Sequence, residues 1–278
     1  MLNTAVEILG LGGVVPLVAA LIVALGVRRC FPSTLCERFP LALGMGVAFL
    51  IGYVLQPAFA GLVPTRHWHW LPYLGLGAAI LGPLGATAGL LTPQRWLLYP
   101  LLALAAAWLL VPTWPALQPV RGLYVCLLAS YFVLLMTLLE RLPERLQGSL
   151  FPGLLSLAAA ATTVLIAAST SLKIGQVAGI ALFALLGCWI ASLWGPAKAG
   201  IRGLIPSYAI LVGGLAFVGS LEPDPPHFLL CLAPAAPLTL WAFTARPLSK
   251  LSGTTAVVSS IAAVLLPLIG IALWELWP

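Results

Sequence analysis

Residues 149–169 read SLFPGLLSLAAAATTVLIAAS, and residues 174–194 read IGQVAGIALFALLGCWIASLW. Neither block contains a charged side chain, and only residues 170–173 separate them. An α-helix needs roughly 20 predominantly apolar residues to cross the ~30 Å hydrocarbon core of a bilayer. The two blocks therefore predict a pair of transmembrane helices joined by a short turn.

The whole chain shares the composition of these two blocks. Of its 278 residues, 62% are hydrophobic and 7% are charged, whereas a soluble domain carries about 25% charged residues. This composition excludes a cytosolic enzyme, a secreted disulfide scaffold and a disordered linker protein. The net charge of +6 is distributed between apolar blocks and not on one face. The lipid bilayer, and not nucleic acid, is therefore the expected partner.

Apolar blocks of this kind recur along residues 1–278, which we expect to form a single transmembrane domain. They are separated by charged or Pro/Gly-rich breaks and cover residues 5–27, 41–63, 72–91, 96–112, 122–139, 149–169, 174–194, 203–220, 227–244 and 254–276. The predicted fold class is an all-α polytopic (multi-pass) membrane protein with about ten transmembrane helices. The N-terminus lacks the positive region of a signal peptide, so the first block is expected to be a retained helix.

The basic residues predict the orientation of these helices. Ten of the 13 Lys and Arg side chains fall in the odd-numbered loops: Arg28, Arg29, Arg38, Arg95, Arg141, Arg145, Lys198, Arg202, Arg246 and Lys250. The even-numbered loops hold the other three: Arg66, Arg121 and Lys173. The positive-inside rule places the odd loops in the cytoplasm. A multi-pass protein of the inner (plasma) membrane follows, with both termini on the non-cytoplasmic side.

An internal repeat is a further expectation from the sequence. At an offset of 130 residues, the Ala-Ile-Leu of residues 79–81 falls on the same three residues at 209–211. The halves would be residues 1–147 and 148–278, with five helices each. An odd number of helices places two such halves in opposite orientations, and inverted repeats of this kind recur in alternating-access carriers. Chance matches in a sequence rich in Leu, Ala and Gly are the alternative.

In helix number and symmetry the chain resembles carrier families built from five plus five helices, such as the bile-acid symporters, the auxin-efflux carriers and the drug/metabolite exporters. The outward termini fit the auxin-efflux arrangement. The asparagine–proline crossover of those carriers has no counterpart here, because Asn3 is the only asparagine. No family motif is matched.

The ninth block contains two prolines three residues apart, Pro234 and Pro237. Proline lacks a backbone N–H and removes a hydrogen bond from an α-helix. If the block is an α-helix, the carbonyls of Leu230 and Ala233 lose their donors. Lipid cannot replace those donors, so the freed carbonyls are expected to line a cavity in a carrier or to pack against neighbouring helices in a subunit.

Uncharged polar residues complete a predicted substrate path. Pro83 and Thr87 belong to a proline-containing, small-residue stretch of the third block, and Ser130 and Tyr131 lie in the fifth. Close helix contact and hydrogen bonds to the helix's own carbonyls are the structural alternatives. Further polar residues of the same kind are Gln56, Thr162, Thr163, Gln176, Ser207, Tyr208, Ser259 and Ser260.

The three histidines, His67, His69 and His227, all fall on the side expected to be outside. Imidazole is a common metal ligand, so a metal site is one interpretation. An interfacial belt together with the neighbouring tryptophans is the other, and it is favoured because the spacing matches no known site. The five cysteines show no CxxC spacing, and we expect no metal and no cofactor.

Enzymatic activity is not expected either. The chain contains no HExxH, no GxSxG and no paired acids within one helix, and no charged residue occupies a helix centre. The acids Glu140 and Glu144 are interpreted as ion-paired within their own arginine-containing loop. Two functions remain: a small carrier that moves a neutral or apolar solute by alternating access, or a non-catalytic subunit or scaffold of a larger membrane complex.

Overall fold

The computed structural model describes residues 10–30, 36–56, 63–86, 93–115, 119–144, 146, 148–194, 198–222, 227–244 and 253–276. Within these ranges the regular structure is helical and no strand is present. The helices are α2 (Val15–Cys30, preceded by the π-helical turn η1, Gly10–Val14), α3 (Phe39–Leu55), α4 (Leu71–Gly85), α5 (Pro93–Leu110), α6 (Arg121–Leu139), α7 (Leu150–Ser169), α8 (Leu172–Leu193), α9 (Lys198–Leu221), η6 (Phe228–Thr244) and α10 (Gly253–Leu276). Short 3₁₀ turns are η2 (Cys36–Arg38), η3 (His67–Trp70) and η5 (Leu142–Glu144).

The predicted all-helical fold is confirmed, because each apolar block coincides with one of these helices. Six helices among the described residues are long and apolar enough to cross a membrane: Gly10–Cys30, Arg121–Glu144, Leu150–Ser169, Leu172–Leu193, Ala199–Leu221 and Thr254–Glu275. Shorter apolar helices cover Phe39–Leu55, Arg95–Leu110 and Phe228–Ala242. The structure is that of a helical, membrane-type protein. Ten membrane crossings remain a prediction.

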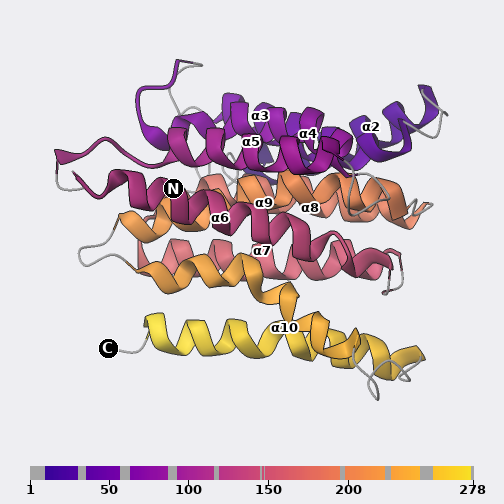
Figure 1. Ribbon diagram of the computed structural model, residues 1–278. Helices are drawn as coiled ribbons and strands as arrows, with labels where there is room; N and C mark the ends of the chain where they lie inside the picture. The colour runs from indigo at the N-terminus through magenta and orange to yellow at the C-terminus, as the bar shows by residue number, and fades with distance from the viewer. Residues whose placement is uncertain are drawn as a thin grey trace.

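The helices lie side by side and run in alternating directions (Figure 1). At one end, Arg28 of α2 donates to the carbonyl of Trp194 after α8 (3.2 Å), and Arg95 of α5 pairs with Glu140 after α6. We call this the Glu140 end. At the other, the Trp114 end, the His67 ring of η3 contacts the Trp114 ring after α5 (centroids 5.6 Å apart). Odd- and even-numbered connections therefore lie at opposite ends of the bundle.

Helix α9 occupies the centre of the bundle. Every residue from 203 to 221 is buried, and α3, α4, α7, α8 and η6 pack around this helix. Small residues permit this close packing: a side chain at Gly213 would meet the Tyr131 ring at 3.1 Å, and one at Gly219 would meet Ile166 at 3.1 Å. The central helix is therefore the element on which the positions of its neighbours depend.

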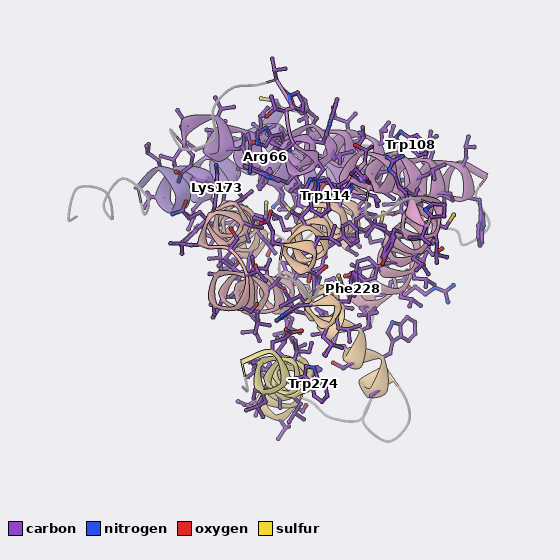
Figure 2. All side chains as sticks on the ribbon, turned by 90° about the vertical axis from the view of Figure 1, so that its left-hand side faces the viewer. Arg66, Trp108, Trp114, Lys173, Phe228 and Trp274 are labelled. Carbon is purple, nitrogen blue, oxygen red and sulfur yellow. The ribbon has the colours of Figure 1, made fainter. Side chains whose placement is uncertain are left out.

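Helix α10 lies at the periphery, as the view onto the Trp114 end shows (Figure 2). Few side chains of Thr254–Glu275 are buried, and Trp274 is 74% exposed, as expected for a side chain that faces lipid. Two polar contacts attach α10 to the rest of the bundle, one near its middle and one near its C-terminal end. Thr239 of η6 donates to the Ala263 carbonyl (2.8 Å), and His227 pairs with Glu275.

The 130-residue offset pairs α3, α4, α5 and α6 with α8, α9, η6 and α10, and paired helices run in opposite directions. The pairing is not uniform in backbone conformation, since α5 is an α-helix and η6 is a 3₁₀-helix. Superposition of the two sets, with halves 1–147 and 148–278, remains a prediction.

Candidate functional site

The ninth helix, η6, has 3₁₀ geometry along its whole length. Its 17 residues would extend about 26 Å at the α-helical rise of ~1.5 Å per residue. At the 3₁₀ rise of ~2.0 Å per residue the same segment extends about 34 Å. The 3₁₀ conformation therefore gives this short segment the length of a membrane span, and it places Pro234 and Pro237, three residues apart, on one face.

The two prolines free two carbonyls, and each freed carbonyl receives a tyrosine hydroxyl. In a 3₁₀-helix the N–H of residue i bonds to the carbonyl of residue i−3, so Pro234 leaves Cys231 without a donor and Pro237 leaves Pro234 without one. Tyr131 of α6 donates to the Cys231 carbonyl (2.8 Å). Tyr208 of α9 donates to the Pro234 carbonyl (2.8 Å).

The sequence-based expectation named the carbonyls of Leu230 and Ala233, and here the structure differs. That expectation assumed an α-helix, in which the bond runs to residue i−4. The 3₁₀ geometry moves each freed carbonyl by one residue. The side chains of Leu230 and Ala233 are fully buried in the core.

The structure does not bring all of the predicted path residues together. Pro83 of α4 packs beside Gly203 of α9. At about 100° per residue, Tyr208 lies on the opposite face of α9 from Gly203, so α9 stands between Pro83 and the prolines of η6. Ser130 is exposed. Thr87 lies outside the described residues.

Hydroxyl groups elsewhere in the predicted path bond within their own helices. Thr162 and Thr163 of α7 donate to the carbonyls four residues earlier (2.8 Å each). Ser259 and Ser260 of α10 do the same (2.7 Å each). These bonds agree with the structural alternative for such residues.

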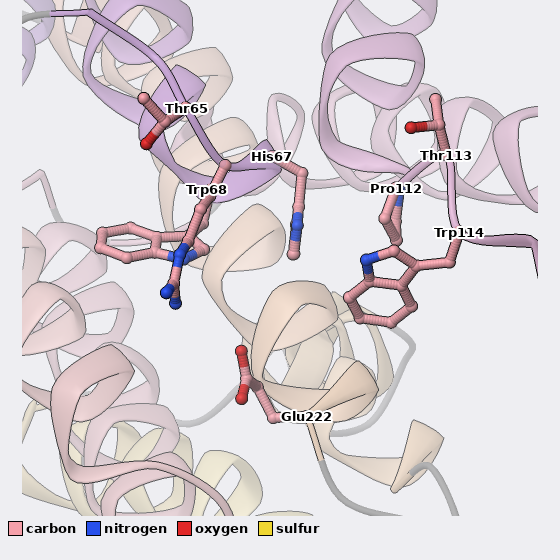
Figure 3. Close-up of a pocket in the computed structure, with 8 residues that line it drawn as sticks. Thr65, His67, Trp68, Pro112, Thr113, Trp114 and Glu222 are labelled. Atoms are coloured by element: carbon pink, nitrogen blue, oxygen red, sulfur yellow. The ribbon is translucent and has the colours of Figure 1, made fainter.

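A pocket of about 330 Å³ opens at the Trp114 end (Figure 3). The His67 and Trp114 rings and the Glu222 carboxylate reach into it from different elements: η3, the segment after α5 and the end of α9 (Figure 3). Among the described residues the lining consists of Thr65, Arg66, His67, Trp68, Pro112, Thr113, Trp114 and Glu222. Aromatic walls with one cation and one anion form a site suited to a small polar molecule.

His67 contributes a neutral ring to this pocket. Burial, and to a smaller extent the nearby His69 and Arg66, lower the pKa of His67 from 6.5 to about 4. Its Nε2 atom is buried without a hydrogen-bond partner in the described part of the chain. Burial also lowers the pKa of His69. Both rings are therefore uncharged at neutral pH.

The histidines contact aromatic and acidic side chains in the structure. No group of three or more His, Cys, Asp or Glu side chains that would hold a metal ion occurs among the described residues. His69 lies against the Trp68 ring (centroids 4.1 Å apart), and His227 pairs with Glu275 of α10. The aromatic contacts of His67 and His69 agree with the interfacial-belt interpretation.

The Glu140 end is joined by ion pairs between helices, whereas the sequence had led us to expect pairing within one loop; Arg145 of that loop lies outside the described residues. Arg95 of α5 pairs with Glu140 (3.0 Å), and both side chains are buried. Tyr99 adds a hydrogen bond to the same carboxylate (3.3 Å). Glu144 pairs with Arg202 of α9. The acids that lie four residues apart in one loop thus connect α5, α6 and α9.

A search of protein-family models finds none that matches the chain, and no curated protein or solved structure is significantly similar to it.

Sequence reasoning identified Tyr131 and Tyr208 as polar but assigned them no partner. The sequence did not indicate that Arg66 and Glu222 line a common pocket. Arg66 is nevertheless one of only three basic residues in the even-numbered loops. That departure from the charge bias was the available signal.

Removal of the Tyr208 hydroxyl tests the capping role. We expect Tyr208→Phe to lower the stability by about 1–3 kcal/mol, because a buried carbonyl loses its donor. In a Pro237→Ala background residue 237 regains an N–H for the Pro234 carbonyl, so the same change should cost clearly less. Chemical unfolding in detergent measures both. The control is Tyr124→Phe, at a ring stacked on Phe228, which should lose the same stability in both backgrounds. If Tyr208→Phe also lost the same stability in both backgrounds, the capping role of Tyr208 would be contradicted.

The lowered pKa of His67 predicts a pH dependence. The folded state holds the neutral ring, so its stability is complete above pH 6.5 and decreases as the pH falls toward 4. His67→Phe should reduce the loss of melting temperature between about pH 7 and about pH 5. A residual slope from His69 is expected. Thr113→Val, in the same pocket, should keep the wild-type profile; an unchanged profile in His67→Phe would refute the assignment.

Proposed function

We propose that the protein is a small carrier of the inner (plasma) membrane, which moves a neutral solute by alternating access. The observation that carries the proposal is the difference between the two ends of the bundle. The Trp114 end has a pocket lined by aromatic, hydroxyl and charged side chains. The Glu140 end is held together by the buried Arg95–Glu140 pair and the Glu144–Arg202 pair. This arrangement corresponds to a carrier that is open at one end and closed at the other.

The ninth helix provides an element that could change conformation. Two of its backbone bonds are replaced by the hydroxyls of Tyr131 and Tyr208. Side-chain hydroxyls can rotate away from these carbonyls without unwinding a turn. Unwound or irregular segments of this kind border substrate sites in known carrier architectures, and movement of α6 or α9 would act directly on η6.

The proposed orientation places the Trp114 end outside, because ten of the 13 basic residues of the chain belong to the opposite loops. With the exposed Cys30 and Cys126 replaced by serine, Val120→Cys should react with an impermeant thiol reagent in intact cells. Arg141→Cys should react only after lysis. Both positions are exposed. The reverse pattern would overturn the orientation, and equal labelling would overturn the ten-helix topology.

Alternating access is testable without knowing the solute. Spin labels at Val120 and Leu172 report the distance between α6 and α8 at the Trp114 end, and labels at Arg141 and Leu193 report it at the Glu140 end. We expect Glu140→Gln, which weakens the pair with Arg95, to lengthen the second distance and shorten the first. Pulsed electron resonance measures both.

Glu37→Gln, which removes an exposed carboxylate at the Glu140 end, is the matched control and should leave both distances unchanged. If each spin-label pair gave one distance and Glu140→Gln changed neither of them, the carrier proposal would be contradicted.

A non-catalytic subunit or scaffold is the second candidate. It is favoured by the capped carbonyls of Cys231 and Pro234, which are bonded to protein hydroxyls. A subunit should co-purify with partner proteins and lose stability when isolated. A carrier should be monodisperse as the isolated chain.

A further inference from the structure

The pocket at the Trp114 end contains one positive and one negative side chain that are not paired with each other. Arg66 precedes η3, and Glu222 follows α9; both line the pocket and both are exposed. Within the described residues the ion pairs are Arg95–Glu140, Arg202–Glu144 and His227–Glu275. Neither Arg66 nor Glu222 takes part in them. The two charges therefore face one cavity while each still has its charged group available.

The remaining lining residues that the structure describes add no net charge. His67 is neutral because burial lowers its pKa to about 4, and the other members are Thr, Pro and Trp. The described lining thus holds one basic side chain, Arg66, and one acidic side chain, Glu222. A simple anion would satisfy Arg66 and leave Glu222 facing a like charge. A simple cation would satisfy Glu222 and be repelled by Arg66. Only a molecule that carries both charges satisfies both residues.

The aromatic walls indicate where each charge would lie. The Trp68 ring of η3 already has a cation beside it, because Lys173 lies over this ring (5.5 Å to the centroid). The Trp114 ring belongs to a different element, and it lies with the Glu222 carboxylate around the same space (Figure 3). A ligand ammonium group beside Glu222 would also be attracted by the Trp114 ring.

We propose that this pocket binds a small zwitterion, with its carboxylate on Arg66 and its ammonium group between Glu222 and Trp114. The volume of about 330 Å³ lies at the lower end of the range for ligand pockets, so the ligand is of amino-acid size. A zwitterion has no net charge and is therefore a neutral solute in the sense of the proposed carrier. Its role as the transported solute rests on that proposed function, whereas its binding does not.

The experiment compares zwitterions with analogues that lack one charge. Isothermal titration of the full chain in detergent at neutral pH would use L-phenylalanine against its methyl ester and its N-acetyl derivative. It would also use 5-aminopentanoate against pentylamine and pentanoate, because the two zwitterions differ in charge separation. We expect at least one zwitterion to bind about tenfold or more tightly than both of its analogues, the effect of one lost charged partner. If neither zwitterion binds better than its analogues, the proposal is overturned.

Two variants assign the charges. Arg66→Gln should weaken binding of the zwitterion about tenfold or more and strengthen binding of the cationic ester, because its repulsion by Arg66 is removed. Glu222→Gln should weaken the zwitterion equally and strengthen binding of the anionic N-acetyl derivative. Arg141→Gln and Glu37→Gln, exposed at the Glu140 end, are matched controls. Unchanged zwitterion affinity in either pocket variant, at an unchanged melting temperature, would overturn the assignment.

The two proposals fail separately. Selective zwitterion binding without any change in the spin-label distances would refute the carrier and leave the binding site intact. Distances that respond to Glu140→Gln without zwitterion selectivity would leave the carrier intact and refute the zwitterion site.

Discussion

The hydrogen bonds from Tyr131 and Tyr208 to the backbone of η6 are the interactions on which the bundle's interior depends. An apolar interior offers few other donors, and a buried carbonyl without one costs about 1–3 kcal/mol. The 3₁₀ geometry lengthens the 17-residue ninth helix, and its prolines free the carbonyls of Cys231 and Pro234. Because the two donors come from α6 and α9, these helices must keep their register with η6.

The same requirement accounts for the small residues of the central helix. Tyr131 reaches η6 across Gly213 of α9, where an added Cβ would meet its ring at 3.1 Å. A larger residue there would displace the tyrosine from its acceptor. Packing and backbone hydrogen bonding are therefore coupled at α9, and the glycines serve close approach between helices. This coupling explains why the most buried helix also carries one of the two capping hydroxyls.

The sequence was sufficient for the helices but only partly sufficient for the site. Uncharged apolar blocks such as residues 149–169 must become helices, because the backbone of a long apolar segment is satisfied within a helix. The hydrogen bond from the Tyr208 hydroxyl to the Pro234 carbonyl was not predictable. Apolar periodicity does not distinguish a 3₁₀-helix from an α-helix when the helices are apolar on all sides. The Arg95–Glu140 pair joins the first turn of α5 to the residue after α6, and only the packing of α5 on α6 brings them together.

The distribution of charge between the two ends links the fold to the proposed activity. At the Glu140 end, opposite charges are brought together, and the buried Arg95–Glu140 pair would leave an uncompensated buried charge if only one partner moved away. At the Trp114 end, Arg66 and Glu222 line one pocket without pairing with each other. A bound molecule that bridged those two residues would hold η3 and α9 together, as the ion pairs hold the other end. Because Arg202 lies on α9 and Glu222 directly follows this helix, closure at one end and opening at the other would both act on α9.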